Sequence, residues 1–335
     1  TWGKKYSAPV ASADKMNAVL SLEDKIADDT VWCGTFNLIW NDLKNELAKK
    51  DIEFTPQLDV VRNLNKGTFN TECLSEDSYY KVYGKPTIEL KKQIEKEIKR
   101  KFNETSDILD DFNWNESGDK DYFLYSMLKK EFEFPKVFDR LEKGKFKDWE
   151  NVKYFGIKKK TSEKVREQVK VLYYNSKEDF AIKLLTKSND EVIISRGNKA
   201  NTFGEIYAEI KENNENFKGS KNIEEDEIVK IPNIDFKLKK EFNEIEAKPF
   251  LFASGEEYVI EKAVQTIEFS LDEKGGRVKS EAGMTNKTTA LLPDLEPREF
   301  LVNDTFCIFL KEKDKELPYF AAKISDITQV QILGN

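Results

Sequence analysis

The sequence of 335 residues contains no histidine. Serine and cysteine nucleophiles are commonly activated by an imidazole, and zinc sites commonly use one as a ligand. The absence therefore excludes Ser–His and Cys–His catalysis and argues against zinc. We expect no catalytic residue, no metal and no cofactor, and we do not expect an enzyme.

Cysteine is scarce as well, with only Cys33, Cys73 and Cys307 in the chain. This odd number, at these spacings, matches no metal motif. Cys33 and Cys307 lie in the apolar stretches TVWCGTF and TFCIFL, which are typical of strands. The expected state of both is a buried free thiol.

Long apolar runs are missing too, since none approaches the roughly 18 residues of a membrane-spanning helix. The net charge of −7 argues against a nucleic-acid partner, because no basic face is evident. The densest basic stretch, residues 153–170, is interspersed with acids and is interpreted as a solvated hairpin. The chain begins at Thr1 without methionine or signal peptide, so we expect a processed or trimmed form.

The composition is sufficient for a large hydrophobic core, because 39% of the residues are hydrophobic and 23 of these are Phe. Charged residues make up a further 35%. In the N-terminal third, residues 38–50 and 87–102 have the periodicity of helices. Thr87 is a suitable N-cap for the second helix, whose apolar residues recur at every fourth position. Such a narrow apolar stripe is typical of a helix lying across a sheet.

From about residue 121 the pattern changes to apolar or alternating runs, which predict strands. The polar residues 211–227 are interpreted as a surface loop, and the carboxylates of 223–227 as solvated, because they lack calcium-ligand spacing. Helices early and strands late, without a repeat, predict one α+β domain. The predicted strands are 122–128, 169–174, 180–185, 191–197, 228–238, 258–271, 306–310 and 318–324.

The C-terminal third carries an ordered set of motifs. The long strand YVIEKAVQTIEFSLDEKGG (258–276) has Glu273 and Gly275 near its end, and FLVNDTFCIFL (300–310) and LPYFAAKISD (317–326) follow. In these features the chain resembles the serpins. That family has a long strand ending in Glu-x-Gly, a small-residue hinge, an exposed reactive loop and two closing strands.

The resemblance extends backwards along the chain. IVKIPNIDF (228–236) is similar to the family's Pro-containing strand, and YFLYSMLKKEFEFPKVFD (122–139) to its central sheet strand. It implies three β-sheets with surrounding helices and an exposed reactive loop near the C-terminus. It assigns residues 1–25 to an N-terminal extension and the start of the first helix, 26–335 to a single serpin-like domain, and about 274–299 to the reactive loop.

The resemblance implies inhibition driven by stored free energy. A protease that cleaves the loop forms an acyl-enzyme, the freed hinge inserts as a new sheet strand, and the dragged protease is distorted before it deacylates. The target's own nucleophile supplies the chemistry. The implied partner is a serine or cysteine protease, and the implied inhibitor is a secreted or cell-surface monomer that binds no nucleic acid.

Insertion would bury alternate hinge residues, because side chains on a strand point to opposite faces. The residues of one parity are small or modest and uncharged, whereas Arg277, Lys279 and Glu281 occupy the other. Since burying an unpaired charge is costly, this sorting permits insertion. The alternative is that 274–299 is a plain connector. The implied hinge residues are Glu273, Gly275, Gly276, Val278, Ser280 and Ala282.

The scissile bond is expected within residues 285–292. Counting from Glu273 as in the family points near Thr289–Ala290. A trypsin-like protease would prefer Lys287, and an apolar primary pocket would prefer Leu291 or Leu292. The candidate residues are Lys287, Thr288, Thr289, Ala290, Leu291 and Leu292.

Beneath its main sheet the family often places a His with Asn and Ser partners, the shutter. The matching positions here hold Gln265, Asn37 and Ser126. Amide–hydroxyl hydrogen bonds are expected to replace the histidine cluster, without its protonation switch. The segment before the long strand is also shorter than in the family, so a helix or two is expected to be missing.

The leading interpretation is a serpin-like suicide inhibitor of a serine or cysteine protease. The alternative is a non-inhibitory serpin-like binding or structural protein, secreted or surface-anchored. A third class is an unrelated ligand-binding domain. Protease treatment separates them, because only loop insertion predicts a covalent complex and a more stable cleaved form.

Overall fold

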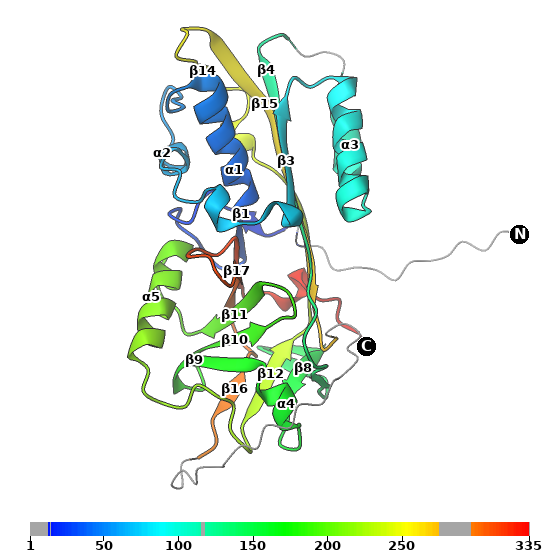
Figure 1. Cartoon of the computed structure of the whole chain (residues 1–335), viewed down its shortest axis with the longest axis vertical. Helices are drawn as coiled ribbons and strands as arrows, with labels where there is room; N and C mark the ends of the chain where they lie inside the picture. Colours follow the sequence, from blue (N-terminus) through cyan, green and yellow to red (C-terminus); the bar gives the residue numbers. More distant parts are fainter. Residues whose placement is uncertain (1–12, 14, 115–117, 275–295, 335) are drawn as a thin grey trace, which may run out of the picture.

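The computed structural model describes residues 13, 15–114, 118–274 and 296–334. Three β-sheets frame this part of the chain, together with a two-stranded ribbon, and helices pack around them (Figure 1). The predicted α+β class with three sheets is therefore confirmed.

A five-stranded sheet, here the main sheet, contains the longest strands. Its two inner strands, β15 and β4, run parallel, whereas the outer pairs β13–β15 and β4–β3 are antiparallel. Short β14 also pairs with β15. The strands are β13 (Ile234–Glu241), β15 (Glu257–Leu271), β4 (Asp121–Glu131), β3 (Tyr79–Gly84) and β14 (Pro249–Leu251).

The seven-stranded sheet holds the two predicted closing strands side by side, β17 next to β18. All seven residues of its inner strand β11 are buried, as expected for a strand covered on both faces. In spatial order the strands are β1 (Asn17–Ala18), β2 (Thr30–Cys33), β18 (Phe320–Ile324), β17 (Phe306–Glu312), β11 (Asp190–Arg196), β10 (Asp179–Leu185) and β9 (Val169–Ser176).

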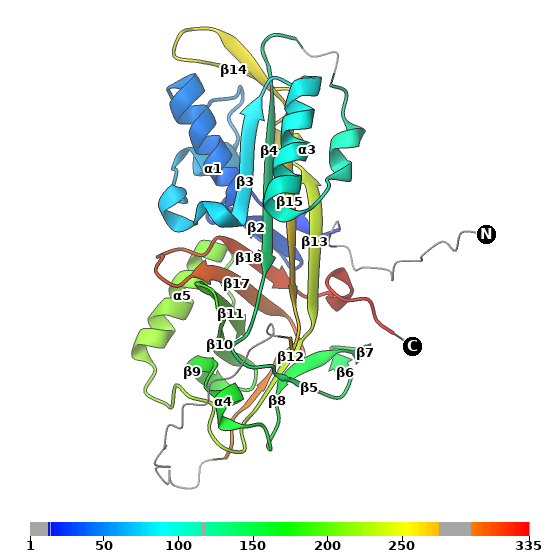
Figure 2. The ribbon, with the colours of Figure 1, turned by 45° about the vertical axis from the view of Figure 1, so that its right-hand side comes forward.

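A four-stranded sheet, here the small sheet, lies at the opposite end of the molecule from α3 (Figure 2). Its strands β12 and β16 are parallel, and β8 is antiparallel to both of its neighbours, β12 and β5. In spatial order the strands are β16 (Glu299–Leu301), β12 (Ile228–Pro232), β8 (Tyr154–Ile157) and β5 (Asp139–Arg140); the ribbon is β6 (Gly144–Phe146) with β7 (Trp149–Val152).

Alternating side chains of the main sheet face two different helices. Leu124 and Ala263 pack in the cluster of α1, whereas Phe123, Tyr125 and Val264 pack in that of α3. α3 crosses this second face (Figure 2) and begins at the predicted N-cap, the Thr87 hydroxyl, which accepts a hydrogen bond from the Leu90 amide at 3.2 Å. The helices are α1 (Thr35–Asp42), continued by a π-helix over Leu43–Ala48, α2 (Asp59–Asn65), α3 (Ile88–Phe102), α4 (Glu163–Arg166) and α5 (Phe203–Asn216).

Seven of the eight predicted strands are present as single strands, but 228–238 divides after Pro232 into β12 of the small sheet and β13 of the main sheet. Three other predictions are also wrong. No helix starts within the described residues 13 and 15–25, which include strand β1, and α1 begins at Thr35. Residues 153–170 are not a hairpin, because β8 and β9 belong to different sheets and α4 lies between them. Residues 211–227 are not wholly a loop, since α5 continues to Asn216.

α5 forms because its N-terminal half has an N-cap and one buried apolar face. The Thr202 hydroxyl accepts a hydrogen bond from the Glu205 amide, and Phe203, Ile206 and Ile210 are buried along one face. The polar residues that predicted a loop are its last turns. The segment before β15 holds only a 3-10 turn, Asn243–Ile245, and β14. Within the described residues, no helix combines the length and apolarity needed to cross a membrane.

Candidate functional site

The centre of the main sheet is its parallel strand pair. β15 and β4 pair from Val259 beside Asp121 to Ser270 beside Glu131, with one register shift between Ile260 and Lys262. Residues 275–295 follow β15 after the three residues 272–274. A segment that turned back at this end and entered between the two strands would run antiparallel to both. The sheet would then be antiparallel from β13 to β3.

A hollow of about 300 Å³ lies where β4 and β15 end. Its apolar lining is Phe132, Phe134, Phe269 and Leu271. The rings of Phe132 and Phe269 are in edge-to-face contact, with centroids 5.9 Å apart. Charged and polar residues make up the remaining lining: Lys129, Lys130, Glu131, Glu268, Ser270, Asp272 and Lys274. The hollow therefore lies at the end of the sheet from which the chain leaves β15, beside a β4–β15 ladder that is paired as far as Ser270 and Glu131.

The face of the main sheet that carries α3 is polar near this end. Lys129 and Glu268 are half-buried there, and Glu131 and Ser270 are exposed. Lys129 forms an ion pair with Glu104 at 2.5 Å. Burial, and next the negative charge of Glu104, raise the pKa of the Glu268 carboxyl. This part of the face tolerates charge, unlike the apolar part beneath α3.

Two of the three predicted shutter residues meet on the opposite face. The Gln265 Nε2 lies 3.0 Å from the Thr35 hydroxyl and 3.4 Å from the Ser126 hydroxyl. It also donates to the Cys33 carbonyl at 3.2 Å. Asn37 is not in this cluster, because its Oδ1 accepts from the Trp32 indole at 3.0 Å. Thr35 is the member that the sequence did not suggest.

Glu273 fixes the point where the chain leaves β15. Its carbonyl accepts a hydrogen bond from the Phe138 amide at 3.0 Å, just before β5, and its carboxylate pairs with Arg140 in β5. Burial alone would raise the pKa of the Glu273 carboxyl, but the hydrogen bond and charge of Arg140 outweigh it and hold the pKa below its usual range. The N-terminal end of residues 275–295 is thus attached to the small sheet.

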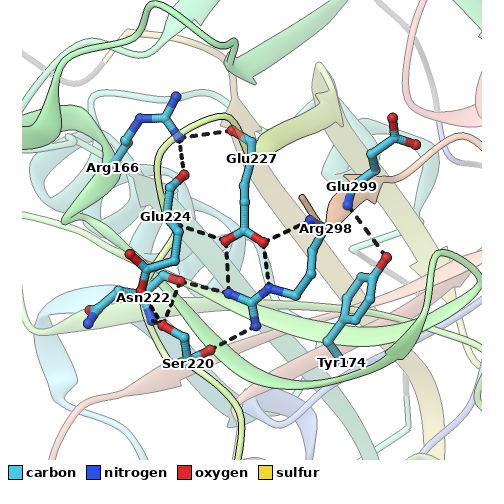
Figure 3. Close-up of polar contacts among 8 residues, drawn as sticks. All are labelled: Arg166, Tyr174, Ser220, Asn222, Glu224, Glu227, Arg298 and Glu299. Atoms are coloured by element: carbon cyan, nitrogen blue, oxygen red, sulfur yellow. Dashed lines mark hydrogen bonds and ion pairs between the residues drawn. The ribbon is translucent and has the colours of Figure 1, made fainter. Parts of the chain in front are cut away.

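Arg298 fixes the point where the chain returns (Figure 3). Its backbone amide and Nε both donate to one Glu227 oxygen, at 2.8 and 2.7 Å, and its Nη2 donates to the other at 2.9 Å. Glu227 is 4% exposed and comes directly before β12. Burial opposes its ionisation, but the hydrogen bonds from Arg298 and two backbone amides keep the pKa of this carboxyl low.

These contacts correct two predictions. The expected loop 274–299 is shorter at its C-terminal end, because Arg298 is paired and Glu299 begins β16. Residues 223–227 are not wholly solvated, because Glu227 is buried in an ion pair. The two partners are 71 positions apart, so no local pattern relates them.

A second buried cation, Arg166, joins this anchor to the turn after β8. Its guanidinium is 3% exposed and donates only to backbone carbonyls. Two of these carbonyls, of Glu224 and Glu227, belong to the turn that holds Arg298 (Figure 3). The other three belong to Lys158, Lys159 and Thr161. The sequence showed only a basic stretch here.

The remaining predicted site residues lie outside the described part of the chain. For the hinge these are Gly275, Gly276, Val278, Ser280 and Ala282; for the scissile region they are Lys287, Thr288, Thr289, Ala290, Leu291 and Leu292. Their roles stay predictions. In the described part, no group of three or more Cys, Asp or Glu residues is placed to hold a metal ion.

The element order matches the serpin features predicted from the sequence. The long strand β15 precedes residues 275–295, closing strands β17 and β18 are paired, and α3 crosses the main sheet. The fold is serpin-like. Serpin48 of the insect Tenebrio molitor is among the similar solved structures, with 14% identity, a TM-score of 0.43, and coverage of 70% of this chain and 64% of that chain.

Two further solved structures have similar values. Thyroxine-binding globulin, solved in complex with thyroxine, shares 12% identity at a TM-score of 0.47 over 70% of this chain and 64% of its own. Human kallistatin shares 12% identity at a TM-score of 0.47 over 82% of this chain and 71% of its own. The matches thus span less than two thirds of the length of the first two structures. No protein-family model and no curated protein matches the sequence.

Proposed function

We propose that this protein is a serpin-like suicide inhibitor of a serine or cysteine protease. The observation that carries the proposal is the parallel pairing of β15 with β4 at the centre of the main sheet. Cleavage within residues 285–292 would free the segment that follows β15. That segment would reverse at Glu273 and enter between the two strands as an antiparallel strand.

The geometry of the pair supports this movement. Insertion would replace one parallel ladder by two antiparallel ladders, a net gain of one ladder of backbone hydrogen bonds. Each hydrogen bond in that ladder would contribute about 1 kcal/mol. Parallel pairing is also slightly less stable per residue than antiparallel pairing. The hollow at the ends of β4 and β15 lies where entry would begin.

The charges of the hinge suit the two faces of this sheet. Gly276, Val278, Ser280 and Ala282 would turn toward the apolar side, and the three charged hinge residues toward the side of Lys129 and Glu268. That side is polar near the point of entry. None of the three charged hinge side chains would therefore be buried unpaired in the core, where it would oppose insertion.

The test begins with a panel of serine and cysteine proteases and the intact protein. An inhibitor gives an SDS-stable covalent complex, and the protein cleaved within 285–292 melts at a much higher temperature than the intact protein. If no protease gives a complex and the cleaved protein melts unchanged, the alternative of a non-inhibitory binding or structural protein replaces this proposal.

A matched pair of variants tests the parity of the hinge. Ser280→Arg places a charge on the inserted face and is expected to turn the inhibitor into a substrate. Glu281→Arg places the same side chain on the outer face and is expected to keep the covalent complex. Equal loss in both variants would contradict strand insertion in this register.

Secretion or display at the cell surface is part of the same proposal, because extracellular proteases are the targets that a secreted inhibitor meets. Fractionation of the producing cells, followed by detection in the medium and on the surface, tests this part. Detection in the cytosol alone would contradict it without affecting the inhibitory mechanism.

A further inference from the structure

The exposed lysines that follow β8 form a concentrated basic surface on a protein of net charge −7. The lysine turn is defined here as residues 158–164. It contains Lys158, Lys159, Lys160 and Lys164, all exposed, against the single acid Glu163. Besides the bonds to Arg166, the Lys158 amide donates to the Thr161 hydroxyl at 2.9 Å and the Thr161 amide donates to the Lys158 carbonyl at 3.0 Å. The Thr161 hydroxyl donates in turn to the Asp139 carboxylate of β5.

Strand register places the lysine turn between the two ends of residues 275–295. Ile157, Val229 and Phe300 are neighbours in one row across the small sheet. Ile157 directly precedes the lysine turn, and Phe300 comes two residues after Arg298. Two strand spacings, about 10 Å, therefore separate the strand end that carries the turn from the strand that receives the loop.

The other end of the loop reaches the opposite edge of the same sheet. Glu273 is bound to Phe138 and Arg140 at β5, which is the neighbour of β8 on the side away from β12. The turn thus emerges from a strand that lies between the two attachment points.

Arg166 makes the turn a preorganised surface. Its buried guanidinium binds three carbonyls of the turn's own backbone and two of the turn that precedes β12. The lysine side chains therefore project from a fixed backbone, which lowers the entropy lost when a partner binds. The same guanidinium ties the turn to the Glu227–Arg298 anchor (Figure 3).

We propose that the lysine turn is a docking surface for an acidic patch on the protease that attacks residues 275–295. The inference rests on the proposed function for the identity of the attacked segment. The basis of the proposal is charge complementarity. Lysine ammonium groups at the edge of an interface accelerate the encounter with an acidic partner. The exposed acids Glu225 and Asp226 of the neighbouring turn oppose this field, and their removal strengthens it.

The experiment compares an anionic and a cationic trypsin, two proteases of the same primary specificity and opposite surface charge. Both can cleave after Arg277, Lys279 and Lys287, and cleavage there is followed by mass spectrometry. For the full chain, the triple variant K158Q/K159Q/K160Q is expected to lower the rate with anionic trypsin about tenfold at low salt. The wild-type rate falls with added salt, and the variant rate changes less.

Matched controls isolate the position of the charge. K92Q/K96Q/K99Q removes three exposed lysines of α3, at the far end of the molecule, and is expected to leave both rates unchanged. Glu225→Gln combined with Asp226→Asn is expected to raise the rate with anionic trypsin. The proposal is overturned if K158Q/K159Q/K160Q and the α3 triple variant behave alike.

The same samples separate this proposal from the proposed function. A lysine-dependent cleavage rate without any SDS-stable complex contradicts inhibition and supports the docking surface. A complex formed at a rate independent of these lysines supports inhibition and contradicts the docking surface. Loss of retention on heparin with unchanged trypsin rates assigns the surface to a polyanion and also overturns the proposal.

Discussion

At the scale of single residues, buried polar groups are the informative positions. Cys33 and Cys307 are buried free thiols, as predicted, and burial raises their pKa to about 11 and about 12. These thiols remain protonated at neutral pH. Gln265 is different, because its amide links β15 to β4 and to the backbone beneath them.

Replacing Gln265 by Ala is expected to cost about 3 kcal/mol of unfolding free energy. The substitution leaves the Cys33 carbonyl without the amide that donates to it and opens a cavity at a residue 1% exposed. Urea denaturation measures the change. The control Asn45→Ala removes an exposed amide and should cost less than about 0.5 kcal/mol. Equal effects would contradict a packing role for Gln265.

At the scale of elements, alternation and apolar runs predicted the long strands, because burial on one or both faces leaves that pattern in the sequence, whereas short strands such as β1, β5 and β14 leave too few residues to show it. α5 was missed because its polar end dominates the window 211–216. The anchors were missed for another reason. Arg298 and Glu227 lie far apart in sequence, and the pairing of their strands alone brings them together. Gln265 and Ser126 were found through family resemblance, not through a local signal.

The contact between β8 and β12 depends on Gly156. Its φ is +151°, and a Cβ there would lie 2.0 Å from the Val229 carbonyl oxygen. Gly156→Ala is therefore expected to separate the strands that carry the lysine turn and Glu227, and to cost about 3 kcal/mol or more. Thermal unfolding measures the loss.

Gly255→Ala is the matched control for this substitution. Gly255 also has a positive φ, +88°, but no atom lies within 4 Å of its added Cβ. Only backbone strain remains, so the expected cost is about 1 kcal/mol. If the two variants unfold at the same temperature, close packing of β8 on β12 is not what requires glycine at position 156.

At the scale of the whole molecule, the main sheet and the small sheet have separate tasks in the proposed mechanism. The main sheet would receive the hinge, whereas the small sheet holds both ends of residues 275–295 through Glu273 and Glu227. In that mechanism, movement of the hinge would strain the first anchor, and the second would have to hold while β16 stays paired.

Both anchor carboxyls have a pKa lowered in the folded protein, so their contribution to stability depends on pH in a defined direction. It is complete above the unfolded value, about 4.3, and is lost as the pH falls through the lower folded value. Glu227→Gln is expected to cost about 2 kcal/mol at pH 7, because Arg298 keeps a buried charge without its partner. Glu273→Gln is expected to cost less, since the Arg140 side chain is 75% exposed and water screens it.

Denaturation at pH 7, 5 and 3 tests this prediction. The difference between wild type and Glu227→Gln should persist from pH 7 to 5 and shrink at pH 3, below the unfolded pKa, because the unfolded carboxyl then binds a proton that the ion pair keeps off the folded one. Glu225→Gln, at an exposed position of the same turn, should follow the wild type at every pH. A difference of constant size down to pH 3 would mean that packing, rather than the ion pair with Arg298, holds the C-terminal end of the loop.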